Sequence, residues 1–169
     1  MPNLSSLSVN ACKLSNTLGC TPQAVKKFLP ECTDNALQSC SREGLLNAYD
    51  NSIAYTDHFL GRVVQWLQTQ QRPAAMLYAS DHGESIGEKG IYLHGMPFNM
   101  APKEQTHVPM ALWVSPAMRQ HWGVDDACLR EQRAKPWSHD NWFHTVLGSA
   151  DVQTALYQPA MDITRACRR

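Results

Sequence analysis

The stretch that decides the fold runs from Pro73 to Glu88 and reads PAAMLYASDHGESIGE. Its first half is a short, nearly continuous apolar run, which is typical of a strand buried on both faces of an α/β sheet. Its second half is a loop with glycines, which allow the backbone to approach an anion closely. Residues that follow such a strand lie where open α/β sheets place their sites. The stretch therefore predicts a functional loop after a buried strand.

Two adjacent side chains in this loop are normal zinc donors. Asp81 offers a carboxylate oxygen and His82 an imidazole nitrogen. His94 follows later and returns a second histidine to the same part of the chain. Four-coordinate zinc needs further ligands from elsewhere, and an Asp-His dipeptide alone is more often a surface turn or a helix cap. The pair alone therefore predicts only part of a zinc site.

A long amphipathic helix is predicted before this strand, over Arg42–Gln70, and Arg72-Pro73 ends it. The apolar residues recur at helical spacing, and the face that they form is expected to pack on the sheet. They are Leu46, Tyr49, Ile53, Leu60, Val63, Val64 and Leu67. The same helix carries a polar cluster, Asn47, Asp50 and Asn51, which we interpret as solvated or hydrogen-bonded to a loop and not as part of a site.

Two more elements follow the loop. Val108–Val114 predicts a second buried strand, closed by Ser115-Pro116, and His139–Leu147 predicts a helix. His139 and Asp140 repeat the Asp-His chemistry in reverse, but they stand where Ser138 or Asp140 would cap the free amides of a helix, so we assign them to capping. The order strand, loop, strand and helix predicts an α/β sandwich.

Charge and hydropathy exclude several classes of function. The chain has 15 basic and 15 acidic residues and no basic block, which argues against a nucleic-acid partner and against electrostatic docking to a membrane. No apolar run approaches the ~20 residues of a membrane-spanning helix. Residues 1–20 also lack the basic start and apolar core of a secretion signal.

Six cysteines are many for a cytosolic chain of 169 residues. Cys32 and Cys40 flank a short polar loop, and Cys12 and Cys20 repeat that spacing. Cys128 and Cys167 remain as a distant pair or as free thiols. A zinc finger is disfavoured because no Cys-x-x-Cys pair is present.

Taken together, these blocks resemble the lipid A phosphoethanolamine transferases, which include the mobile colistin-resistance enzymes and belong to the alkaline phosphatase and sulfatase superfamily. The blocks that carry the resemblance are SDHGESIGE (80–88), YLHGMP (92–97), APKEQ (101–105), CSREGLLNAYDNSI (40–53) and SHDNWFHTVLG (138–148). The resemblance covers residues 28–169, which would be the C-terminal part of a catalytic domain with a partial α/β/α sandwich. Residues 1–27 depart from the family pattern and form an atypical N-terminal segment.

The resemblance also implies roles for single residues. Asp81 and His82 would bind the catalytic zinc, and His94 would lie near the phosphate of the substrate or near a second metal. Cys32 and Cys40 would form a disulfide, which is stable in an oxidising compartment such as the periplasm. The threonine nucleophile and a glutamate ligand of the family come from segments N-terminal to these blocks, so no catalytic nucleophile is assigned in this chain.

The function implied by the resemblance is transfer of phosphoethanolamine from phosphatidylethanolamine to lipid A, at the periplasmic face of the inner membrane. The parent enzyme would be held there by an N-terminal membrane anchor that these residues do not contain. We therefore expect a fragment that is inactive alone. Two alternatives remain open: a sulfatase- or phosphatase-type hydrolase of the same superfamily, and a non-catalytic remnant that binds zinc or a partner.

Overall fold

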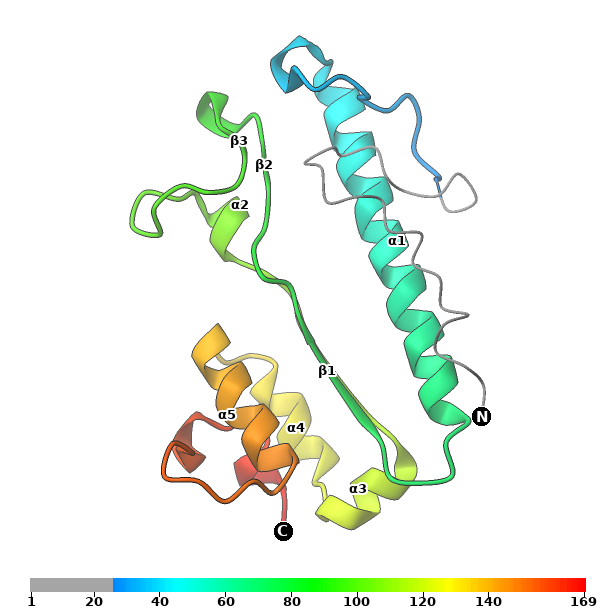
Figure 1. Ribbon diagram of the computed structural model, residues 1–169, viewed down its shortest axis with the longest axis vertical. Coiled ribbons are helices and arrows are strands. Elements are labelled where there is room, and N and C mark those ends of the chain that lie inside the picture. The colour runs from blue at the N-terminus through cyan, green and yellow to red at the C-terminus, as the bar shows by residue number, and fades with distance from the viewer. Residues whose placement is uncertain (1–25) are drawn as a thin grey trace. The chain divides into compact units, whose positions relative to one another are not determined.

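The computed structural model describes residues 26–169, which form two compact units (Figure 1). The first unit contains the described residues up to Arg62 together with Glu84–Gln105. The second contains Val63–Gly83 and Thr106–Arg169. The predicted division at residue 27 lies beside the undescribed segment and stays a prediction.

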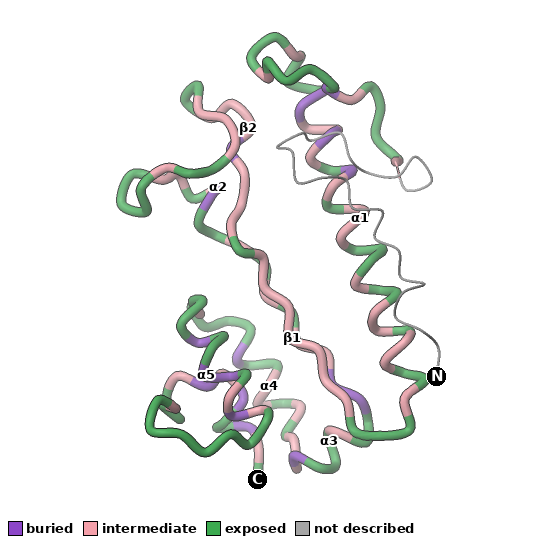
Figure 2. Tube along the Cα trace, in the orientation of Figure 1, coloured by how far each residue is buried: buried purple, intermediate pink, exposed green. Residues whose placement is uncertain are grey.

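Helix α1 spans Arg42–Gln68 and confirms the predicted long helix (Figure 1). It begins after Ser41, whose hydroxyl oxygen accepts the backbone N–H of Gly44 at 3.0 Å and so satisfies one of the free amides of the first turn. The buried positions of α1 gather in its N-terminal half. In Figure 2 they are the purple segments of this helix.

The polar cluster of α1 fastens the preceding loop to the helix. Asn51 is fully buried, and its side chain accepts the backbone N–H of Phe28 at 3.0 Å and donates to the carbonyl of Phe28 and to Glu31. Asn47 donates to a backbone carbonyl of the same loop, whereas Asp50 is exposed. The predicted helix-to-loop hydrogen bonding is confirmed for the two asparagines.

Strands β2 (Ser85–Ile86) and β3 (Tyr92–Leu93) form a short antiparallel hairpin in the first unit. Its turn contains Gly87 at φ 110°, a left-handed conformation that glycine adopts without steric cost. Helix α2 (Lys103–Thr106) is joined to the hairpin by Gln105, which donates a buried hydrogen bond of 2.9 Å to the hydroxyl of Ser85.

The second unit is built on strand β1 (Ala75–Ala79), which pairs antiparallel with β4 (Met110–Val114). Both predicted strands are confirmed. All five residues of β1 are half-buried, so the expectation of a strand covered on both faces was wrong for these residues. The physical reason is that β1 pairs with a single strand within residues 26–169, and a two-stranded sheet leaves much of its surface open.

Three α-helices follow β4. Helix α3 (Pro116–Trp122) is capped by Ser115, whose hydroxyl accepts the backbone N–H of Met118, and α4 (Asp126–Gln132) is capped by Asp125. Helix α5 (His139–Ser149) confirms the predicted C-terminal helix. Its N-cap is Ser138, one of the two residues that the sequence offered for this role, and the side chain of Asn141 accepts the backbone N–H of Ser138 at 2.9 Å.

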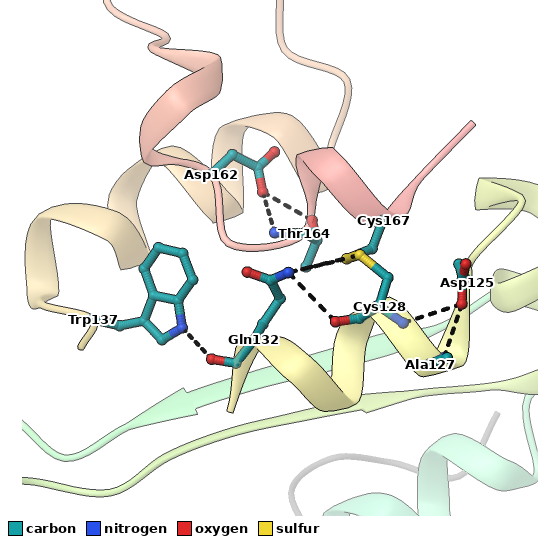
Figure 3. Close-up of a disulfide and its surroundings, with 8 residues drawn as sticks. All are labelled: Asp125, Ala127, Cys128, Gln132, Trp137, Asp162, Thr164 and Cys167. Atoms are coloured by element: carbon teal, nitrogen blue, oxygen red, sulfur yellow. Dashed lines mark hydrogen bonds between the residues drawn. A yellow bond between two sulfur atoms is a disulfide. The ribbon is translucent and has the colours of Figure 1, made fainter. Parts of the chain in front are cut away.

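A disulfide fastens the C-terminus onto these helices. Cys128 in α4 and Cys167 in the short helix η6 (Arg165–Cys167) are bonded, with their Cα atoms 5.5 Å apart (Figure 3). Beside it the indole of Trp137 donates to the carbonyl of Gln132 at 2.7 Å. The sequence left these two cysteines open as a pair or as free thiols, and the structure pairs them.

A buried network of hydrogen bonds and one ion pair is formed by residues close to Cys167 along the chain. The carboxylate of Asp162 is fully buried and contacts Arg168 at 2.5 Å, while Tyr157 donates its hydroxyl to the same oxygen at 2.8 Å. Arg168 also donates to the carbonyl of Gly148 in α5 at 2.8 Å. Burial, followed by the hydrogen bond to Asp162, raises the pKa of Tyr157 above its ordinary value.

The first unit has its own disulfide. Cys32 and Cys40 are bonded with their Cα atoms 5.7 Å apart, which confirms the predicted pairing. Cys12 and Cys20 lie outside the described residues. Within the described part of the chain, no helix combines the length and the apolar character needed to cross a bilayer.

Candidate metal centre

The candidate site begins at Ser80, the first residue after β1. Its backbone N–H donates to the carbonyl of Pro109 at 3.2 Å, which extends the pairing of β1 and β4 by one bond. Its hydroxyl donates to the carbonyl of His82 at 2.8 Å. Because both bonds hold the first residue of the loop, the chain leaves the strand in a defined direction.

Asp81 and His82 follow directly. The Asp81 side chain is 89% exposed, and its Oδ2 lies 3.6 Å from Nε2 of His82. The His82 ring places Nδ1 3.1 Å from the carbonyl of Gly83. A carbonyl oxygen can only accept, so Nδ1 donates this hydrogen bond, and Nε2 is the ring nitrogen that could ligate a metal, as in metal-binding histidines.

The β2–β3 hairpin brings His94 next to Glu84, near the beginning of the loop that follows β1. Ser85 pairs with Leu93, so the next residues outward, Glu84 and His94, face one another across the two strands. Nδ1 of His94 lies 2.8 Å from Oε1 of Glu84. The two side chains are 41% and 21% exposed, respectively, so the pair is held by the hairpin but remains open to solvent.

Three side chains of this loop form a group that could hold a metal ion. His82, Glu84 and His94 each offer one ligand atom, and these atoms all lie within 4.8 Å of one another. The proximity is local, because His82 stands two residues before Glu84 and the hairpin register brings back His94. Two imidazole nitrogens and one carboxylate oxygen are a donor set that zinc accepts.

The structure therefore brings together two of the three predicted site residues. His82 and His94 belong to the group, and Asp81 does not, although its carboxylate stands beside the His82 ring. The prediction from sequence missed Glu84. The signal that could have found it is the hairpin: glycines at 87 and 90 predict a turn whose register places residue 84 opposite residue 94.

A comparison with protein families identifies the domain. The family model described as Sulfatase matches residues 2–152. The chain belongs to the sulfatase family. Among curated relatives, phosphoethanolamine transferase EptA of Salmonella typhimurium is 45% identical over 151 residues, which cover 88% of this chain and 28% of that protein. Phosphatidylethanolamine transferase Mcr-1 of Escherichia coli is 53% identical over 89 residues, which cover 52% of this chain and 16% of that protein.

A solved structure agrees with these sequence relatives. The soluble domain of lipooligosaccharide phosphoethanolamine transferase A from Neisseria meningitidis superimposes with a TM-score of 0.84 at 44% identity, and the match covers 88% of this chain and 45% of that one. The chain thus has part of an alkaline phosphatase and sulfatase-like α/β fold, as predicted. It spans about 28% of the length of the Salmonella relative.

Proposed function

We propose that this chain supplies the metal-binding loop and the C-terminal helices of a zinc-dependent phosphoethanolamine transferase. The observation that carries the proposal is the grouping of His82, Glu84 and His94 on the loop after β1, within a chain 45% identical to a phosphoethanolamine transferase. Histidine and carboxylate donors at the end of a strand are what a metal-assisted phosphoryl transfer requires.

Zinc, when bound, lowers the pKa of a coordinated hydroxyl and offsets charge on the phosphoryl group. In the proposed site His82 would bind the metal through Nε2, and Asp81, whose side chain is exposed, would turn its carboxylate toward the same ion. Glu84 and His94 would complete the donor set with a carboxylate oxygen and an imidazole nitrogen, and His94 would also lie near the substrate phosphate or a second metal.

Ser85 is the hydroxyl nearest to this group in the sequence, and it does not suit the role of nucleophile. It is 1% exposed, and its oxygen accepts the hydrogen bond from Gln105. A phosphate could not reach it without opening the hairpin. We therefore place the threonine nucleophile of the reaction outside the described residues, in agreement with the family resemblance.

The proposed donor is phosphatidylethanolamine and the proposed acceptor is lipid A, at the periplasmic face of the inner membrane. The names of the relatives from Escherichia coli and Neisseria meningitidis support this choice, since they specify phosphatidylethanolamine and lipooligosaccharide. The disulfides Cys32–Cys40 and Cys128–Cys167 are consistent with an oxidising compartment.

Calorimetric titration of zinc into the purified chain tests the metal part of the proposal. We expect measurable but weak binding, because a site with three grouped donors leaves the ion incompletely coordinated. His82→Ala and His94→Ala should each weaken it by about tenfold or more. His121→Ala, which removes an exposed histidine of α3, is the matched control and should have no effect. Equal affinity in all four proteins would refute the assignment.

A further inference from the structure

Ser80 is held from a third direction by a residue far away in the sequence. Nε2 of His139, the first residue of α5, lies 2.8 Å from the carbonyl oxygen of Ser80, 59 residues earlier. A carbonyl oxygen only accepts hydrogen bonds, so His139 donates from Nε2. With the bonds to Pro109 and His82, the N–H, carbonyl and hydroxyl groups of Ser80 are all engaged.

The carbonyl of Ser80 controls the direction of the residue that follows it. It belongs to the same planar peptide unit as the backbone nitrogen of Asp81, so fixing the C=O direction fixes the direction in which the chain continues to Asp81. His139 therefore acts on the loop at the point where it leaves β1. The hydrogen bond from the Ser80 hydroxyl to the carbonyl of His82 also restrains the next residue, His82.

Helix α5 is a firm support for such a contact. The Asn141 side chain donates to the carbonyl of Met161 at 2.9 Å, and the fully buried hydroxyl of Thr145 accepts the backbone N–H of Ile163 at 3.0 Å. Both bonds fix the helix to the C-terminal segment and leave Ser80 untouched. The His139 side chain itself stands at the exposed end of the helix, where its replacement creates no cavity.

We propose that His139 is a positioning residue for the metal-binding loop, acting through the carbonyl of Ser80 on Asp81 and His82. The inference rests on the proposed function, since it assigns His139 to that same site. It differs from the capping role predicted from the sequence, because capping uses Ser138 and Asn141 and does not require the His139 ring.

The test measures zinc affinity by calorimetry in the complete 169-residue chain. His139→Ala should weaken binding by about tenfold, the effect typical of losing a residue that orients a ligand. His139→Gln should recover most of it, because the glutamine amide can donate from the position of Nε2. His121→Ala, which removes an exposed histidine of α3, is the control and should change neither zinc affinity nor amide hydrogen exchange at Asp81 and His82.

A second readout does not depend on zinc. In the metal-free chain, His139→Ala should speed amide hydrogen exchange at Asp81 and His82, and His139→Gln should restore protection. Unchanged exchange and unchanged affinity in His139→Ala would overturn the inference, as would an equal loss of affinity in His121→Ala. If His82→Ala also leaves zinc affinity unchanged, the proposed function itself fails. If His82→Ala weakens binding and His139→Ala does not, only the positioning role fails.

Discussion

Gly148 in the last turn of α5 is a position where a single methyl group should be strongly destabilising. A Cβ built on it would lie 2.7 Å from the hydroxyl of Tyr157 and 2.8 Å from Nη2 of Arg168, and closer still to Oδ2 of Asp162. These atoms are the ends of side chains, but they are not free to move, because they bind one another in a buried network.

The magnitude follows from two opposing effects. Replacing glycine by alanine in a helix normally stabilises it by about 1 kcal/mol. Here the methyl group must push Asp162 away from Arg168, whose side chains are 0% and 6% exposed, and breaking a buried ion pair costs about 3–5 kcal/mol. We therefore expect Gly148→Ala to lower the free energy of unfolding of the second unit by about 2–4 kcal/mol.

The assay is urea unfolding followed by tryptophan fluorescence, together with amide hydrogen exchange of α5. Gly61→Ala is the matched control, because Gly61 also lies in a helix, α1, and a Cβ there meets nothing within 4 Å. It should be neutral or stabilise the protein by up to about 1 kcal/mol. If Gly148→Ala were as stable as Gly61→Ala, the buried network would not be as rigid as argued.

Two further predictions concern the ionisation of Tyr157 and the two disulfides. The pKa of Tyr157 is raised in the folded state, so its contribution to stability is present below pH ~10 and is lost as the pH rises further. With rising alkaline pH, the free energy of unfolding should therefore fall less in Tyr157→Phe than in the unchanged protein. An equal fall in both proteins would contradict this. Removing the Cys128–Cys167 disulfide should lower the free energy of unfolding by about 4 kcal/mol, and removing Cys32–Cys40 should lower it by about 2.5 kcal/mol, because the sequence separations are 39 and 8. Urea unfolding of the two double Cys→Ser variants measures both losses. A larger loss for Cys32–Cys40 would refute the loop-length argument.

The elements that the sequence predicted correctly are those fixed by local patterns. Helix α1 follows from apolar residues at helical spacing, β1 and β4 from short apolar runs bounded by prolines, and α5 from its cap at Ser138. In each case the residues that decide the element lie within it or directly beside it. Tertiary contacts were not needed to find them.

The features that the sequence did not reveal depend on residues that meet only in the folded chain. Glu84 joins His94 through the register of the hairpin, and His139 reaches Ser80 across 59 residues. Cys128 and Cys167 are separated by 39 residues, and neither spacing nor composition selects that pair over free thiols. The half-burial of β1 likewise depends on how many strands surround it.

Mass spectrometry of lipid A tests the central claim most directly. The matched segment of this chain would replace the corresponding segment of the Salmonella relative, and the chimera would be expressed in a strain without its own phosphoethanolamine transferase. Lipid A should gain phosphoethanolamine, and Asp81→Ala, His82→Ala and His94→Ala should each abolish or strongly reduce the gain, while His121→Ala should not. A folded, membrane-located chimera that leaves lipid A unmodified, or that modifies it equally well with all three site residues replaced, would contradict the claim.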